Sequence, residues 1–109
     1  LRNDPAFRDE SKTLIVFLYA YDTPAQESIC VAHGIREDFI GKNMWNVRTP
    51  SGRFLHQEII EMMERDERGW MEYEWLHPIR KKAQAKQSYL IRLVLKDGRK
   101  AFVGCGFWK

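Results

Sequence analysis

The segment KTLIVFLYAYDTPAQESICVAH, residues 12–33, decides the fold. Its first half is apolar in both alternating sets of positions, which is typical of a central strand covered on both faces. The letters DTPA at 22–25 are turn residues, and the chain after them alternates as far as His33. This pattern predicts a β-hairpin whose strands cover residues 12–21 and 28–33.

The rest of the chain predicts one helix and three more strands. In residues 54–65, FLHQEIIEMMER, apolar side chains recur at i, i+3 and i+4, as in an amphipathic helix. Strands are predicted over residues 70–76, 87–96 and 100–108, with the Asp-Gly pair at 97–98 as a tight turn between the last two. This order predicts an α+β fold in which one helix packs on one face of a mostly antiparallel sheet of five strands.

Three glycines are expected to be required by the backbone. A short helical turn is predicted in residues 34–43, and it would end at Gly41 with a positive φ. Gly104 and Gly106 alternate in the last predicted strand, where they would leave room on one face for larger neighbours.

Composition and charge limit the classes of function. The 109 residues fit one domain, and 44% hydrophobic with 30% charged residues is typical of a globular chain. The 18 Lys and Arg against 15 Asp and Glu leave a net charge of only +3, so no nucleic-acid partner is expected. The basic cluster of Arg80, Lys81, Lys82 and Lys86 is expected to be a solvated turn. No run approaches the roughly 18–20 apolar residues that cross a bilayer, so we expect this chain not to be embedded in a membrane.

The chain has no pattern that is typical of catalysis or metal binding. It contains no glycine-rich phosphate loop, nucleophile elbow or His–Cys constellation, so we expect that it is not an enzyme. The three histidines, His33, His56 and His77, lack metal-ligand spacing, so no metal is expected. Cys30 and Cys105 lie in apolar strand patterns and are expected to be small buried side chains, although a disulfide between them stays open.

Several short motifs occur in a specific order along nearly the whole chain. They are DPAF at 4–7, IGKN at 40–43, SGR at 51–53, GWMEYEW at 69–75 followed by Pro78, KQSY at 86–89 and VGCGF at 103–107. Each motif alone is weak. As an ordered set, placed around a strand that ends at His33, they resemble the single Cache domains of bacterial signalling proteins.

This resemblance implies a PAS-like sensor domain over residues 1–109. It would be the input part of a chemotaxis receptor or sensor kinase, or a small secreted Cache protein, in the periplasm or otherwise outside the cytoplasm. The implied partner is a small organic ligand, such as a carboxylate or an amino acid, and no cofactor is implied. Such domains usually follow a long N-terminal helix, which we expect to be absent or upstream here, so a homodimer stays open. The chain also departs from the family in its basic loop, residues 76–85, and in Gly34 where members usually have proline.

The strand patterns suggest where a ligand would bind. Alternation in residues 70–76 places Met71, Tyr73 and Trp75 on one face, and an aromatic face of this kind walls a cavity or fills a core. Both readings stay open for each aromatic residue. Glu72 and Glu74 lie on the opposite face, as expected for the solvated side of a sheet.

Three further residues are candidates for the same site. Lys86, at the predicted start of a strand, is a candidate for the charge that holds a carboxylate, although a surface position stays open. We therefore expect Lys86→Met to weaken binding without changing the melting temperature. Tyr89 shares its strand phase with Ile91 and Leu93, which predicts that it faces the core. His33 can supply a donor or a charge, and the resemblance makes it a residue of the pocket wall.

Two other functions remain possible from the sequence. A PAS-like protein-interaction module without a ligand would show the same strand pattern, with aromatic side chains filling each cavity. The aromatic content of 13% is high enough for that. A haem- or flavin-binding relative would need an axial ligand or a stacking pocket, and only His33 or His56 would serve as the axial ligand.

Overall fold

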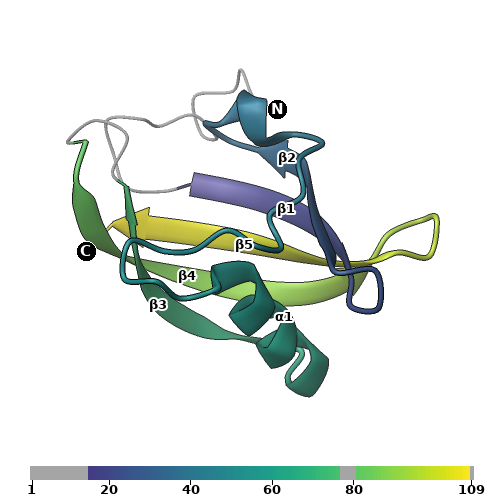
Figure 1. Cartoon of the computed structure of the whole chain (residues 1–109). Coiled ribbons are helices and arrows are strands. Elements are labelled where there is room, and N and C mark those ends of the chain that lie inside the picture. Colours follow the sequence, from purple (N-terminus) through teal and green to yellow (C-terminus); the bar gives the residue numbers. More distant parts are fainter. Residues whose placement is uncertain (1–14, 77–80, 109) are drawn as a thin grey trace.

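The computed structural model describes residues 15–76 and 81–108 and shows one antiparallel sheet with a single α-helix against it (Figure 1). The elements are β1 (Ile15–Asp22), β2 (Glu27–His33), the short 3₁₀ helix η1 (Glu37–Phe39), α1 (Leu55–Arg65), β3 (Arg68–Leu76), β4 (Ala83–Val94) and β5 (Lys100–Trp108). The predicted α+β class and order of elements are confirmed. The motif at 4–7, together with His77, Pro78 and Arg80, lies outside the described residues.

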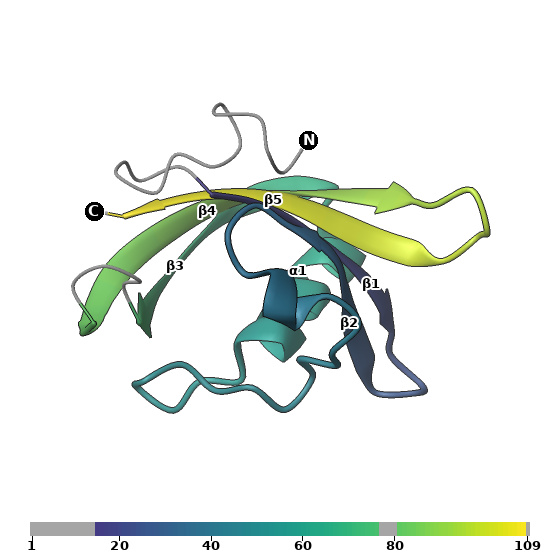
Figure 2. The same ribbon diagram turned by 90° about the horizontal axis from the view of Figure 1, so that it is seen from above.

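Strands β1 and β5, which are far apart in the sequence, are neighbours in the middle of the sheet. The strand order is β2-β1-β5-β4-β3, and every neighbouring pair is antiparallel. The predicted hairpins β1–β2 and β4–β5 are present, and β1 pairs with β5 to join them. Figure 2 shows that the sheet arches over α1, η1 and the chain between them, so these segments all lie on its concave side.

The core lies between the concave face and α1. Ile59 and Met63 on the helix, and Leu90 and Phe102 on the sheet, are essentially inaccessible to solvent. Burying a side chain of this size contributes about 1.5–3 kcal/mol, so this layer supplies much of the stability of the domain. The predicted role of the apolar helix stripe as a packing surface is confirmed.

The chain between β2 and α1 is attached to the edge of the sheet. Main-chain hydrogen bonds join Gly41 N–H to the Cys30 carbonyl at 2.8 Å and Met44 N–H to the Ser28 carbonyl at 2.8 Å. Gly41 has φ +86°, as predicted for the glycine that ends the short helical turn. This attachment holds the segment after β2 over one end of the concave face.

None of the helices in the described part of the chain has the length and apolar character needed to cross a membrane.

Candidate functional site

Two hollows lie at the end of the concave face where β1 begins and β5 ends. The outer hollow has a volume of about 340 Å³, and the inner hollow, next to α1, has a volume of about 30 Å³. The outer hollow is lined by Ile15, His33, Ile35, Arg36, Trp75, Leu76, Lys81, Lys86 and Trp108. The inner one is lined by Phe17, Tyr19, His33, Phe39, Leu55, His56, Ile59, Tyr73, Trp75 and Lys86. His33, Trp75 and Lys86 line both, so they separate the two spaces.

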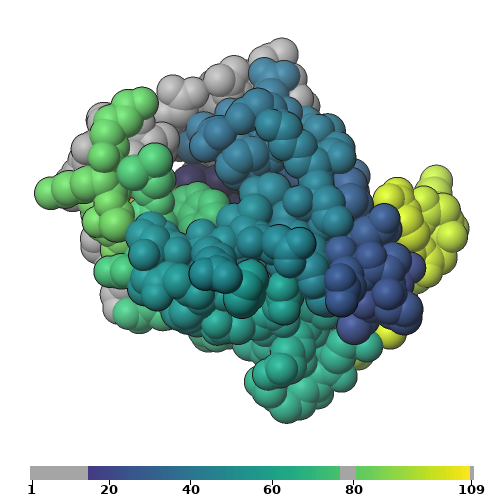
Figure 3. All heavy atoms as spheres, viewed as in Figure 1, coloured from purple at the N-terminus to yellow at the C-terminus, as the bar shows by residue number. Residues whose placement is uncertain are grey.

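Figure 3 shows this region from the side of α1. The green ends of β3 and β4 and the blue-teal segment after β2 surround a recess, and the purple start of β1 is visible in its depth. The recess is therefore built from segments that lie far apart in the sequence.

Lys86 is buried at the junction of the two hollows. It lies inside β4, which begins at Ala83, and only 4% of its surface is exposed. Its Nζ lies 5.2 Å from the ring centroid of Trp108, 5.6 Å from that of Phe17 and 5.9 Å from that of Tyr73. Burial lowers the pKa of Lys86 to about 8. The sequence left open that Lys86 lies on the surface, and that alternative is wrong. In β4 the side chain of Lys86 faces the concave side of the sheet and is buried in the core.

The ammonium of Lys86 has no acidic partner within residues 15–76 and 81–108, where every recorded ion pair is made by another basic residue. A buried cation without a counter-ion is costly unless something else compensates its charge. The three surrounding rings offset part of this cost, since a cation over an aromatic face is attracted to it. An anion entering the outer hollow would offset the rest.

His33 is held as a neutral hydrogen-bond donor. Its Nδ1 accepts the backbone N–H groups of Ile35 at 3.2 Å and Arg36 at 2.9 Å, so the ring proton resides on Nε2. Burial, together with the nearby charges of Lys86 and Arg36, lowers the pKa of His33 to about 4. His33 therefore contributes an N–H rather than a charge to the wall of the hollows.

Tyr73 and Trp75 lie on the same concave face, as alternation along β3 predicted. Their ring centroids are 6.3 Å apart, and both rings line the inner hollow. The Tyr73 hydroxyl is 2.8 Å from Ser88 Oγ, and burial raises the pKa of Tyr73 to about 12. Tyr73 is thus fixed in the wall, while Trp75 also reaches the outer hollow.

The predicted orientation of Tyr89 is wrong. The inward phase of β4 consists of Lys86, Ser88 and Leu90, so Tyr89 lies on the convex face. There its ring centroid is 4.9 Å from that of Trp70. The prediction failed because β4 carries apolar residues in both phases, and the convex face has an aromatic cluster of its own.

Sequence reasoning missed Phe17 and Trp108, and it considered His56 only as an axial ligand of a haem-binding relative. Phe17 and Trp108 surround Lys86, and His56 forms the floor of the inner hollow with its Nδ1 2.8 Å from Ser28 Oγ. Burial lowers the pKa of His56 to about 3, so its ring is neutral. One signal was available: His56 precedes Ile59 and Ile60 by three and four residues, which places it on the buried helix face.

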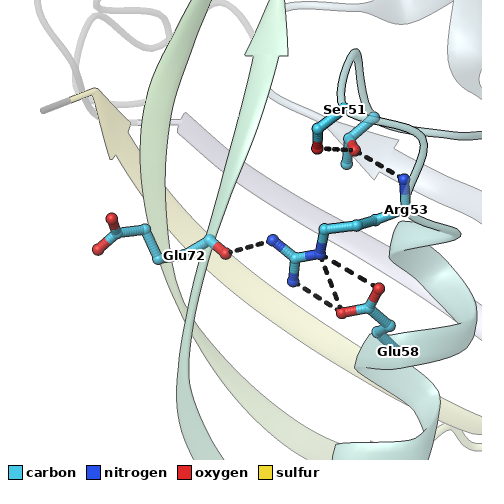
Figure 4. Close-up of polar contacts among 5 residues, drawn as sticks. Ser51, Arg53, Glu58 and Glu72 are labelled. Atoms are coloured by element: carbon cyan, nitrogen blue, oxygen red, sulfur yellow. Dashed lines mark hydrogen bonds and ion pairs between the residues drawn. The ribbon is translucent and has the colours of Figure 1, made fainter.

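Arg53, in the motif SGR at 51–53, fixes the start of α1 to the sheet (Figure 4). Its guanidinium donates to both carboxylate oxygens of Glu58, the shortest bond being 2.7 Å, and to the main-chain carbonyl of Glu72 at 2.9 Å. Its backbone N–H donates to Thr49 Oγ1 at 3.1 Å. This clamp connects the loop, the helix and β3, and so holds α1 under the inner hollow.

We expect Arg53→Lys to lower the free energy of unfolding by about 1 kcal/mol, because lysine cannot reproduce a fork that binds a carboxylate and a carbonyl together. The value is modest because the Arg53 and Glu58 side chains are 38% and 41% exposed. Urea denaturation measures it. The exposed Arg68, changed to lysine, is the matched control and should behave as the parent does. Equal midpoints for both variants would contradict the clamp.

The described residues hold no metal or disulfide site. Among them, no three His, Cys, Asp or Glu side chains lie together in a way that could hold a metal ion. Cys30 and Cys105 are both free thiols, one on the concave face and the other on the convex face, so the sheet separates them.

A larger hollow, of about 720 Å³, lies at the opposite end between the two hairpin turns. One of the carboxylates that line it, Glu64, already accepts hydrogen bonds from the Tyr21 hydroxyl at 2.7 Å and from Lys100 Nζ at 3.0 Å. Asp97 is likewise paired with Arg99 at 2.9 Å. Because these charges compensate one another, this hollow offers a ligand less than the one at Lys86.

Comparisons with solved structures show the same fold. The periplasmic sensor domain of a chemotaxis protein superposes with a TM-score of 0.69 at 22% identity, over 85% of this chain and 59% of that chain. A Cache chemosensory domain, studied for the structural basis of carboxylic acid recognition, gives 0.68 at 16% identity, over 85% and 58%. A methyl-accepting chemotaxis protein from Vibrio parahaemolyticus gives 0.65 at 21% identity, over 94% and 63%. This chain therefore spans less than two thirds of each of these chains.

Comparison by sequence gives the family. No curated protein matches the chain. Residues 16–94, from β1 to the end of β4, match the family described as Single Cache domain 2. That match covers well over half of the chain, and the fold of the solved structures agrees with it. The chain therefore belongs to the single Cache domain 2 family.

Proposed function

We propose that this sensor domain binds a small carboxylate in the outer hollow and works outside the cytoplasm, as the input part of a bacterial chemoreceptor or sensor kinase or as a small secreted protein. The observation that carries the proposal is Lys86, a buried ammonium at the junction of two hollows with no carboxylate near it among the described residues. The carboxylic acid recognition described for one protein of the same fold supports the choice of ligand.

The walls around Lys86 suit a small organic acid. Trp75, Trp108 and Ile15 give the outer hollow an apolar wall, and His33 adds an uncharged N–H donor. Ligand sites of this kind are mostly apolar with a few fixed polar groups that set orientation. Lys86 and the neutral His33 would both donate hydrogen bonds to a carboxylate, and an ionised carboxylate only accepts them.

Amino acids fit the hollows less well than simple carboxylates do. No Asp or Glu occurs among the described residues that line either hollow. The ammonium group of an amino acid would therefore be desolvated near Lys86 without an acidic partner. We propose a carboxylate without an amino group as the ligand.

The hydrogen-bonded pair of Ser28 and His56 does not support a catalytic role. Ser28 and His56 form a hydrogen-bonded pair of a hydroxyl and an imidazole, but Ser28 is fully buried and His56 is covered by the helix–sheet core. No carboxylate hydrogen-bonds to the His56 ring among the described contacts. This pair is a satisfied part of the core, and the proposal is binding alone.

Calorimetric titration with a set of short carboxylates tests the proposal. We expect at least one acid to bind the parent, and Lys86→Met to weaken it by about 1.5–3 kcal/mol, the usual contribution of a charged hydrogen bond. Lys96→Met is the matched control, because it removes the same charge from an exposed turn residue. Equal affinity in the parent and Lys86→Met would remove Lys86 from the site. Failure of every acid to bind the parent would favour a protein-interaction module without a ligand.

A further inference from the structure

We propose that the ligand is a dicarboxylate whose first carboxylate pairs with Lys86 and whose second lies at the mouth of the outer hollow against Arg36 and Lys81. This inference rests on the proposed function, since it assumes that the hollow binds a carboxylate. It adds a second anionic group and names the residues that select for it.

The outer hollow is positively charged at two depths. Lys86 lies at its inner end and is almost completely buried, whereas Lys81 is exposed and the Arg36 side chain is 46% exposed. These three are the charged side chains among the described residues that line the hollow, and all are cations. A ligand with one carboxylate would compensate the inner charge alone. At the mouth Arg36 already pairs with Asp38, so Lys81 supplies the charge that a second carboxylate would compensate.

The wall between the two charged ends is apolar. Ile15, Ile35, Trp75 and Trp108 line it, so a short hydrocarbon segment can lie there without desolvating a polar group. Charges at both ends and an apolar stretch between them match the chemical outline of a dicarboxylate. A phosphate, whose charge is concentrated at one centre, matches this outline less well.

Arg36 is held beside the mouth with donors to spare. Its backbone N–H donates to His33 Nδ1 at 2.9 Å, and its guanidinium lies 4.1 Å from the Phe39 ring centroid. The guanidinium bonds to Asp38 through Nε and Nη2, and within residues 15–76 and 81–108 the N–H groups of Nη1 have no recorded acceptor. The pair with Asp38 is bidentate and compensates the charge of Arg36, so Arg36 offers a second carboxylate hydrogen-bond donors rather than an uncompensated charge.

Lys81 is positioned by an unusual backbone conformation. Its φ is +58°, a left-handed value that residues other than glycine adopt infrequently. Such a conformation in a residue that lines a hollow is typical of positions with a functional constraint. The adjacent Lys82 is exposed and does not line the hollow, so the basic loop contains one lysine at the mouth and another outside it.

Succinate and butyrate provide the test, because they share a four-carbon chain and differ in the second carboxylate. We expect succinate to bind the parent about fivefold more tightly than butyrate, the effect of one partly exposed ion pair. Lys81→Met should reduce this ratio toward one without weakening butyrate, because it removes a charge at the mouth and leaves the pair of Arg36 and Asp38 intact. Lys82→Met, in the same loop, is the matched control and should keep the parent's ratio. Because the mouth is exposed, about 0.5 M NaCl should also reduce the ratio through screening.

The outcomes separate the two proposals. Equal binding of succinate and butyrate to the parent, or an unchanged ratio in Lys81→Met, overturns the dicarboxylate inference while carboxylate binding at Lys86 stands. If Lys82→Met lowers the ratio of succinate to butyrate affinity as much as Lys81→Met does, the dicarboxylate inference is also overturned. The effect would then come from net charge alone. If neither acid binds the parent, and no other acid does, both proposals fall.

Discussion

Replacing Gly104 with alanine is expected to lower the free energy of unfolding by about 3 kcal/mol or more. An added Cβ would overlap the ring of Phe17 and lie 2.8 Å from Leu90 Cδ2, in the middle of the central strand β5. Overpacking a core costs about 1–3 kcal/mol when neighbours can move, and more when they cannot. Phe17 and Leu90 are both buried, and the backbone is paired on both sides, so little relief is available.

Urea denaturation of Gly104→Ala measures this cost, with Gly69→Ala as the control. In β3 the added Cβ of Gly69→Ala would meet only the flexible side chain of Met62, at 3.1 Å, so a much smaller change is expected. Combining Gly104→Ala with Phe17→Leu should cost less than the sum of the two single changes, because the smaller side chain removes the overlap. A parent-like midpoint for Gly104→Ala would show that this space is not used.

The elements of the fold were predictable because their signals are local. An Asp-Gly pair between two apolar runs is a strong hairpin signal, and the helix at residues 55–65 has apolar residues at regular helical spacing. The glycines of β5 were also predictable, because glycine inside a strand indicates a close neighbour. The structure shows those neighbours to be Phe17 and Leu90 at Gly104, and Ser88 and Lys86 at Gly106.

The site was predictable only in part, because it depends on which face of each strand is buried. For β3 the charged residues mark the outer face, so Tyr73 and Trp75 were placed correctly. For β4 both phases contain apolar residues, and the apolar character of Tyr89 and its neighbours indicated the wrong one. Lysine is among the residues least often buried, so composition gave no reason to expect Lys86 inside.

The mouth of the hollow could not be predicted from strand patterns at all. Arg36 and Lys81 lie in irregular segments, and no periodicity relates them to β4. Their positions depend on the hydrogen bonds of His33 and on the left-handed backbone at Lys81. A pairing of this kind between loops follows from tertiary structure, which a single sequence does not give.

The burial of Lys86 also changes what its removal should do to stability. A surface lysine would leave the melting temperature nearly unchanged, but a buried ammonium destabilises the folded state because it is desolvated. Lowering the pKa of Lys86 from 10.5 to about 8 corresponds to about 3 kcal/mol of destabilisation by the protonated side chain. We therefore expect Lys86→Met to stabilise the ligand-free domain by about 2–3 kcal/mol at pH 7.

The pH dependence of that difference identifies its cause. Below pH 8 the lysine is protonated in both the folded and the unfolded chain, so the parent has the full desolvation cost. Between pH 8 and 10.5 the unfolded chain binds the proton and the folded chain does not, so the parent's free energy of unfolding rises with pH. The advantage of Lys86→Met should therefore be largest near pH 7 and shrink toward pH 10, while Lys96→Met stays close to the parent throughout. Urea denaturation of the three proteins at both pH values measures this. An advantage that does not change with pH would assign the effect to packing rather than charge.

With a carboxylate bound at pH 7, the parent should become more stable than Lys86→Met. The bound carboxylate stabilises the parent through Lys86, whereas the variant offers it no such partner.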